Sequence, residues 1–293
     1  MAGVPEMNFC EPAHPPPPAA TFQNLSATEK AQKRFSLTGK CAAARGLGLT
    51  IPEGFLEHDA AAIALLDLDE EEGQKAVHTL HLRFPERQTN IIFRPTDIID
   101  AESLGKIIHE IAESFGKLDI LVCLTGIVNS VRATDYSLDS FRKSYDMSTS
   151  GTFLTAQAVG REMITRKTGG SIILTAATAG HIANNPQTHV AYDTSKAGVQ
   201  HMTNCLAAEW AEYGIRVNSL SPGYLDSGLN ATDDLANLLP TSFEKIPMGR
   251  MGLQEELTGP ILLLASTAGS FMKGFDLRVD GELALEFLTP FQG

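Results

Sequence analysis

Three segments determine the predicted fold: Gly-Gly-Ser-Ile-Ile-Leu-Thr at 169–175, Tyr-Asp-Thr-Ser-Lys at 192–196 and Ile-Arg-Val-Asn-Ser-Leu-Ser-Pro-Gly at 215–223. The first and third contain short apolar runs bounded by glycine, proline or polar residues, a pattern typical of buried strands. The stretch from 192 to 213 between them is amphipathic and long enough to return the chain across a parallel sheet. This order of strand, helix and strand predicts one βαβ unit.

The same alternation extends over the chain from about residue 35. It predicts an α/β fold in which a doubly wound parallel sheet carries helices on both faces, within a single domain. We expect strands at Ala61–Leu66, Asn90–Arg94, Leu118–Leu124, Ser171–Thr175, Arg216–Ser219 and Phe275–Val279, and crossover helices near Ala101–Phe115, Ser137–Thr165, Tyr192–Tyr213 and Glu255–Ala265.

Composition narrows the classes of partner. The 293 residues are 43% hydrophobic and 20% charged, with a formal net charge of −12. Nucleic acids and anionic membrane surfaces would repel such a chain, so we expect a small-molecule substrate. No segment reaches the roughly 18 apolar residues of a membrane helix, and the N-terminus has no apolar run of signal-peptide length. The four cysteines lack a CxxC pair and are expected to stay reduced, which favours a cytoplasmic location.

The first 36 residues differ from the rest of the chain. They contain the tract Pro15 to Pro18 and few periodic apolar positions, so they bury too little surface to offset the entropy of ordering. We predict a flexible N-terminal arm at 1–36, followed by a domain at 37–293. Docking of the proline tract on an SH3 or WW domain is the less favoured alternative.

Tyr192 and Lys196 are the candidate catalytic pair. A spacing of four on a helix places the phenol and the ammonium on one face, a turn apart. A nearby positive charge stabilises a phenolate, so the tyrosine could exchange a proton with an alcohol or a carbonyl group. Most Tyr and Lys residues at this spacing are only helix-surface neighbours, so the pair needs support from its surroundings.

That support comes from its position after the 169–175 strand and before the stretch from Asn204 to Gly223. This arrangement resembles the short-chain dehydrogenases/reductases over about residues 35–285, and within them the fungal NAD(P)-dependent reductases of ketoses and polyols, such as sorbose reductases. The resemblance implies a Rossmann-type sheet, Tyr192 as acid/base, and Lys196 as the residue that lowers its pKa and holds the nicotinamide ribose.

The resemblance also implies cofactor contacts. Asp67 ends a predicted strand, where its carboxylate would bind the adenosine ribose and repel a 2′-phosphate; NAD is therefore preferred over NADP. Arg45, beside the glycine turn, favours NADP instead, and Asp67 could also be an ordinary solvated acid in the run Asp67 to Glu72. Further cofactor-binding residues implied by the resemblance are Gly46, Leu47, Gly48, Asp97, Leu225 and Ser227.

The glycine turn departs from the family pattern. The stretch from Gly39 to Gly48 keeps the late glycines but lacks about four residues that should end the first strand and open the turn. Residues 35–38 could be recruited to the sheet as a slipped strand, and a wrongly joined coding sequence would also explain the gap. Pro52 falls in the first helix, where it costs about 3 kcal/mol unless that helix starts late.

The active-site pattern has changed as well. The serine that the family uses to hydrogen-bond the reacting oxygen is Ala177 here, and loss of such a donor typically lowers the rate about 10²–10³-fold. We expect Thr178 to substitute for it, with Thr175 as the alternative. Ser148 stands where the family has its relay asparagine, and a water could still bridge from its hydroxyl. Leu124-Thr125-Gly126 stands where the family has Asn-Ala-Gly.

The sequence thus predicts an NAD(P)-dependent oxidoreductase that moves a hydride between nicotinamide and a ketone or secondary alcohol. The substrate would be a sugar, a polyol or a fungal secondary-metabolite intermediate. The alternative is an eroded scaffold that acts as a binding subunit or in a non-redox step such as a cyclisation. His181 and His189 lack carboxylate or cysteine neighbours at ligand spacing, so no metal is expected. By resemblance we expect a homodimer or homotetramer.

Overall fold

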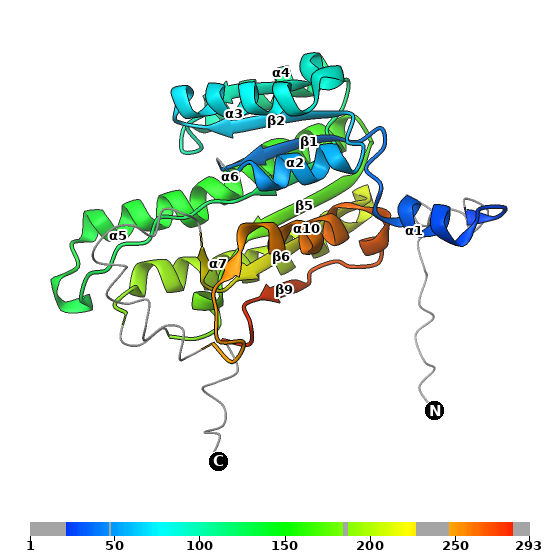
Figure 1. The fold of residues 1–293 in the computed structure, drawn as a ribbon. Helices are drawn as coiled ribbons and strands as arrows, with labels where there is room; N and C mark the ends of the chain where they lie inside the picture. Colours follow the sequence, from blue (N-terminus) through cyan, green and yellow to red (C-terminus); the bar gives the residue numbers. More distant parts are fainter. Residues whose placement is uncertain (1–21, 47, 184–186, 227–245, 284–293) are drawn as a thin grey trace, which may run out of the picture.

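A seven-stranded parallel sheet forms the centre of the computed structural model, which describes residues 22–46, 48–183, 187–226 and 246–283 (Figure 1). The predicted α/β class with a parallel sheet is confirmed. In spatial order the strands are β3 (Ile91–Pro95), β2 (Ala62–Asp67), β1 (Cys41–Arg45), β4 (Ile120–Cys123), β5 (Gly170–Thr175), β6 (Ile215–Pro222) and β9 (Asp276–Val279).

The strand order reverses between β1 and β4, which are hydrogen-bonded neighbours although β2 and β3 separate them in sequence. Arg45, the last residue of β1, lies opposite Cys123, the last residue of β4. In open α/β sheets, ligands bind outside the carboxyl ends of the strands at such a reversal. A ligand-binding site is therefore expected at this edge of the sheet.

Helices cover both faces of the sheet, and each face has its own apolar core. One core includes Phe55, Leu80 and Ile261 from α2, α3 and α10. The other includes Ile108 from α4 and Val199 from α7, together with residues of α6. These helices are α2 (Thr50–Glu57), α3 (Glu70–Arg83) and α10 (Thr258–Ala265) on the first face, and α4 (Ala101–Phe115), α6 (Gly151–Thr165) and α7 (Val190–Glu209) on the second.

Local sequence fixes where several helices begin and end. Asp100 caps α4 by accepting a hydrogen bond from the backbone N–H of Ser103, and Gly116 ends this helix with φ of 78°. The predicted helix at Ser137–Thr165 is interrupted: α5 (Leu138–Tyr145) is followed by a π-helical turn at Asp146–Ser150 before α6 begins. Such turns often occur at functional sites.

The first strand was missing from the strands expected from the sequence, and it consists of the residues just before the shortened turn. Cys41–Arg45 pairs along its whole length with β2, so the slipped-strand alternative is wrong. Thr38 forms only an isolated antiparallel bridge with Ala60. Helix α2 starts at Thr50, which places Pro52 in the first turn, where a missing N–H costs no helical hydrogen bond.

Part of the expected N-terminal arm is helical. Helix α1 (Ala27–Phe35) has a capping box between Ser26 and Glu29 and no buried residue. It is attached to the body by the Thr267 hydroxyl, which donates to the Arg34 carbonyl at 3.0 Å. Residues 1–21 lie outside the described residues, so the arm and the boundary at 36/37 stay a prediction.

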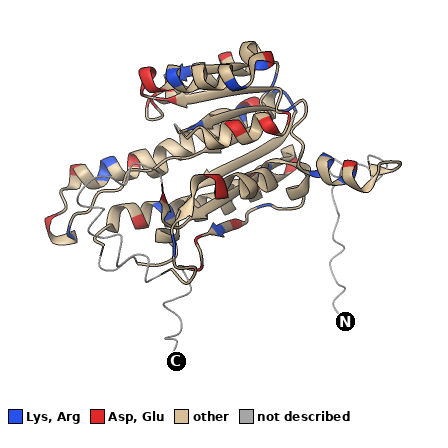
Figure 2. Ribbon diagram, in the orientation of Figure 1, with Lys and Arg blue, Asp and Glu red and all other residues tan. Residues whose placement is uncertain are grey.

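The surface of the described chain is mixed in charge. Figure 2 shows Lys and Arg residues interspersed with Asp and Glu residues along the helices. Among the described residues, no helix is both long enough and apolar enough to cross a membrane.

Candidate active site

Tyr192 and Lys196 lie on α7 and meet at the carboxyl ends of β4 and β5. Lys196 is buried, and its Nζ donates to the carbonyl of Thr125 at 2.5 Å and to that of Thr175 at 2.6 Å. The same Nζ lies 5.6 Å from the centroid of the Tyr192 ring. The structure thus brings the predicted pair together and fixes the ammonium between the ends of two strands.

The electrostatics of the pair differ from the expectation. Burial lowers the pKa of Lys196 to about 8, and the nearby charge of Arg45 lowers it further while Cys123 opposes the shift. Burial, with a smaller contribution from Asp193, raises the pKa of Tyr192 to about 12. The expected lowering of the tyrosine pKa is not found, and at neutral pH Tyr192 is a protonated phenol. This is the form that can donate a proton to a carbonyl oxygen.

Asp193 is a second titratable group beside the tyrosine, and no motif in the sequence singles it out. Burial raises its pKa to about 6, and its Oδ1 is buried without a hydrogen-bond partner among the described residues. His189, whose pKa is lowered by burial, packs edge-on against Tyr192 with ring centroids 6.5 Å apart. Asp193 and His189 both line a cavity of about 490 Å³. A substrate approaching Tyr192 from this side would meet polar groups.

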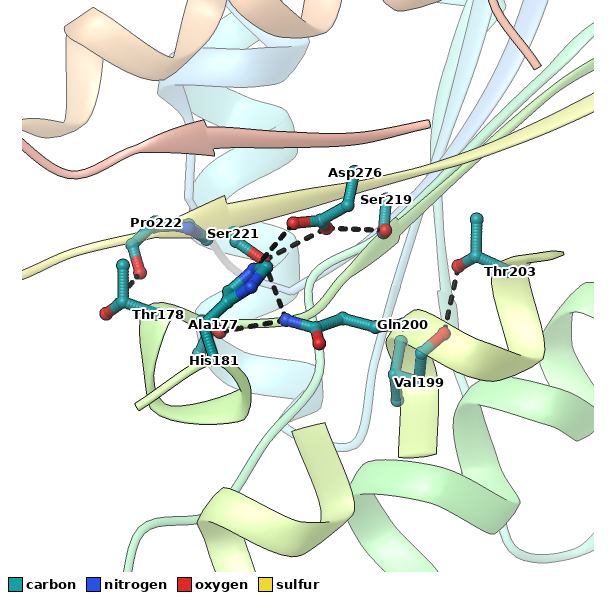
Figure 3. Close-up of polar contacts among 10 residues, drawn as sticks. All are labelled: Ala177, Thr178, His181, Val199, Gln200, Thr203, Ser219, Ser221, Pro222 and Asp276. Carbon is teal, nitrogen blue, oxygen red and sulfur yellow. Dashed lines mark hydrogen bonds and ion pairs between the residues drawn. The ribbon is translucent and has the colours of Figure 1, made fainter. Parts of the chain in front are cut away.

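The turn after β5 carries Ala177 and Thr178. Burial leaves Ala177 6% exposed, and it has no hydroxyl to offer. Thr178 Oγ1 donates to the carbonyl of Pro222 at 3.3 Å, so the hydrogen of this hydroxyl is directed to β6 (Figure 3). Thr175 Oγ1 is buried and lacks a partner among the described residues. Which threonine substitutes for the family's serine stays a prediction.

A polar network attaches this turn to the edge of the sheet (Figure 3). His181 Nε2 lies 2.8 Å from one carboxylate oxygen of Asp276 on β9 and 3.3 Å from Ser221 Oγ. The hydroxyls of Ser219 and Ser221 donate to the other oxygen of Asp276 at 2.5 and 3.0 Å. Gln200 on α7 donates to the Ala177 carbonyl at 3.4 Å. The network joins β6, β9 and α7 behind the position of the missing serine.

Ser148 lies in the π-helical turn, fully buried. Its Oγ has no partner among the described residues, and its carbonyl accepts a hydrogen bond from Thr152 Oγ1 at 2.7 Å. An unpartnered buried hydroxyl costs free energy unless water or a ligand satisfies it. This position therefore fits the water bridge expected from the sequence.

The glycine turn after β1 lies at the same carboxyl edge of the sheet. Gly46 has φ of 109°, and a Cβ there would lie 2.9 Å from the Leu124 carbonyl oxygen, so only glycine fits. Gly48 precedes α2, whose first turn has no side-chain cap and leaves backbone N–H groups at this edge. Leu47 lies outside the described residues. The close backbone approach of the glycine turn is thus retained although the turn is short.

The adenosine end of the expected site is also at this edge. Asp67 ends β2, and its Oδ1 accepts the Leu68 N–H at 2.7 Å. Asp97 follows β3, accepts the Ile99 N–H at 2.9 Å and lines a cavity of about 400 Å³ between β3 and α5. Leu225 lies in the short strand β7 (Leu225–Asp226), and Ser227 lies outside the described residues. The two carboxylates thus lie at the carboxyl ends of β2 and β3, where the adenosine end of a dinucleotide is expected.

No metal site is found in the described ranges, where no three His, Cys, Asp or Glu side chains are placed to hold an ion. His181 and His189 instead contact protein groups: the carboxylate of Asp276 and the ring of Tyr192.

Known proteins are similar to this chain in sequence and in fold. A family model described as enoyl-(acyl carrier protein) reductase matches residues 41–282. Galactitol 2-dehydrogenase of Rhizobium johnstonii is 34% identical over 255 residues, 85% of this chain and 96% of that protein. Sorbose reductase of Schizosaccharomyces pombe is 40% identical over 182 residues, 61% of this chain and 69% of the relative.

Solved structures also match this fold. The crystal structure of a gluconate 5-dehydrogenase from Burkholderia cenocepacia, in complex with NADP and tartrate, matches with a TM-score of 0.76 and 33% identity, covering 86% of this chain and 98% of the other. The sheet, the Tyr192–Lys196 pair and the matched family model lead to one conclusion: this chain belongs to the short-chain dehydrogenase/reductase family.

Proposed function

We propose that this protein is an NAD(P)-dependent oxidoreductase that interconverts a ketone and a secondary alcohol on a sugar or polyol. The observation that carries the proposal is the buried Lys196 held beside a protonated Tyr192 at the carboxyl edge of the sheet. The names of the galactitol, sorbose and gluconate relatives support the substrate class. A fungal secondary metabolite with the same functional group is the less favoured substrate.

The residues of this chain have separate roles in that reaction. Asp67 and Asp97 would hold the adenosine end of the cofactor, and Lys196 the nicotinamide ribose. The bound nicotinamide supplies or accepts the hydride. Tyr192 donates the proton of its hydroxyl to the oxygen of the ketone during reduction, and a phenol with a pKa of about 12 is fully protonated for this step at pH 7.

Cofactor choice follows from Asp67. A carboxylate at the end of β2 binds the ribose hydroxyls and repels a 2′-phosphate, so we propose that NAD is preferred over NADP. The gluconate 5-dehydrogenase, which has a similar fold, was solved with NADP. The proposed preference for NAD therefore rests on Asp67 and not on the fold.

Catalysis is proposed to be slow. Ala177 cannot hydrogen-bond the reacting oxygen, and the Thr178 hydroxyl is directed to Pro222. Loss of one such donor typically costs about 10²–10³ in rate. The same two observations favour the second candidate function, a member of the family that binds its ligand without redox turnover or shapes a non-redox reaction such as a cyclisation.

The test is a fluorescence titration of the purified chain with NADH and NADPH, followed by turnover assays. The panel includes sorbose, galactitol, gluconate and, because of the family model, an enoyl thioester. We expect nucleotide binding and turnover of a ketose or polyol. Tyr192→Phe should lower kcat about 100-fold or more and leave the Kd for NADH within about twofold.

Three results would count against the proposal. The first is a chain that binds neither nucleotide, and the second is turnover of the enoyl thioester alone. Nucleotide binding without turnover of any compound, unchanged in the Tyr192→Phe variant, would favour the non-redox alternative.

A further inference from the structure

Arg45 stands where the family's glycine turn would begin, and it is the last residue of β1. Its neighbours in register are Leu66 on β2 and Cys123 on β4. Side chains alternate along a strand, and Ala43 packs in the core under α4, α6 and α7, so Arg45 is directed to that same face. This is the face on which α7 carries Lys196.

Among the described residues, the guanidinium of Arg45 has no hydrogen-bond or ion-pair partner. Its Nε is buried without a hydrogen bond, and within 22–46, 48–183, 187–226 and 246–283 the side chain forms no ion pair. A half-buried cation without a counter-charge is costly. Arg45 therefore differs from Arg166 and Arg250, each of which pairs with a glutamate.

Lys196 adds a second positive charge without a carboxylate. Its described partners are two backbone carbonyls, and the charge of Arg45 is among the causes that lower its pKa. No carboxylate is among the groups that shift that pKa. The positive charges of Arg45 and Lys196 repel each other at the crevice between β1 and β4. A bound anion there would be attracted by both charges.

We propose that Arg45 binds the diphosphate of the dinucleotide and takes over from the backbone amides that the shortened turn has lost. This inference rests on the proposed function. Arginine hydrogen-bonds phosphate oxygens in a bidentate manner, which a short loop with few amides cannot reproduce. The first turn of α2, which begins five residues later, supplies the remaining backbone N–H groups.

The diphosphate is favoured over the 2′-phosphate of NADP by position. The 2′-phosphate would lie beside Asp67 at the end of β2, on the adenosine side. Arg45 instead lies opposite Cys123 of β4, and its side chain is on the sheet face where α7 carries Lys196, the residue of the nicotinamide side. Between these two ends lies the diphosphate.

The experiment measures the Kd of four ligands by fluorescence or calorimetric titration: NADH, NADPH, ADP and adenosine. The proteins are the full chain, Arg45→Gln, Arg45→Lys, and Lys106→Gln as a control that removes an exposed charge from α4. Arg45→Gln should weaken NADH, NADPH and ADP about 10- to 100-fold and leave adenosine unchanged. Arg45→Lys should recover part of the loss, and Lys106→Gln should bind as the full chain does.

Salt dependence gives a second readout. If Arg45 contacts the diphosphate, the Kd of ADP should rise less steeply with NaCl in Arg45→Gln than in the full chain. Thermal unfolding of the ligand-free variants shows whether Arg45→Gln still folds. If it does not fold, the Kd values of Arg45→Lys and the full chain for NADH and ADP are compared instead.

Several outcomes would overturn the inference. Equal Kd values for Arg45→Gln and the full chain would do so, as would a loss confined to NADPH, which would assign Arg45 to the 2′-phosphate. Unchanged nucleotide binding with a raised KM for gluconate alone would assign it to a substrate carboxylate. If the full chain binds no nucleotide, the proposed function fails as well, whereas binding of ADP without turnover would leave the Arg45 inference standing.

Discussion

Replacing Lys196 by methionine should change how the free energy of unfolding depends on pH. The pKa of Lys196 is about 8 in the fold, against an ordinary value of 10.5. At 1.36 kcal/mol for each pH unit, burying the charged ammonium costs about 3 kcal/mol. Methionine has a similar length and no charge, so Lys196→Met removes this cost at every pH.

The sign follows from counting protons. Below pH 8 the lysine is protonated in both states, and the fold carries the full cost. Between pH 8 and 10.5 the unfolded chain still holds a proton that the fold has released, so stability rises with pH. For Tyr192 the order is reversed: its pKa rises from 10.0 to about 12 in the fold, so stability falls as the pH goes from 10 to 12.

The assay is urea unfolding at pH 7, 8, 9 and 10, followed by fluorescence of the buried Trp210, the only tryptophan of the chain. The full chain should gain about 2–3 kcal/mol between pH 7 and 10 relative to Lys196→Met. Loss of the two hydrogen bonds to Thr125 and Thr175 lowers the stability of the variant by a constant amount, so only the slope is diagnostic. Parallel pH curves for the two proteins would refute the reasoning.

Three further predictions concern the rest of the site and the assembly. Ala177→Ser should raise kcat by up to about 100-fold with little change in the Kd for NADH; an unchanged kcat would mean that a threonine already supplies the missing hydroxyl. Asp276→Asn should lower the free energy of unfolding by about 1–3 kcal/mol, because His181 and two serine hydroxyls lose a charged acceptor, and His181→Gln, which leaves both serine hydroxyls bonded to Asp276, should cost less. Equal losses in urea unfolding would contradict this order. By resemblance, the helical stretches Ser137–Thr165 and Tyr192–Tyr213 are expected to pair between copies, so light scattering should give a dimer or tetramer, and a monomeric mass would contradict that prediction.

The architecture could be predicted because its signals are local. Apolar runs such as Ile172 to Leu174 are buried on both faces, and five of the six predicted strands both begin and end within two residues of the observed ones. The strand at Cys41–Arg45 was not predicted because three of its five residues are alanine, which does not favour an extended conformation. Its position in the centre of the sheet comes from pairing with β2 and β4, which are distant in sequence.

The site was only partly predictable for a related reason. Tyr192 and Lys196 share one helix, so their spacing alone places them together. The contact between His181 and Asp276 joins residues 95 positions apart, and no local pattern marks it. The direction of the Thr178 hydroxyl and the raised pKa of Tyr192 depend on packing and burial, which residue types do not specify.

The short connection between β1 and α2 bears on how this protein could be altered. The strand before it is fully paired, and the helix after it begins with Pro52 already in its first turn, so both elements form although the segment between them is short. Doubling a loop costs only about 0.6 kcal/mol in closure entropy. The junction after Arg45 can therefore accept grafted residues of other nucleotide-binding turns, which makes it a natural place to exchange cofactor preference without redesigning the core.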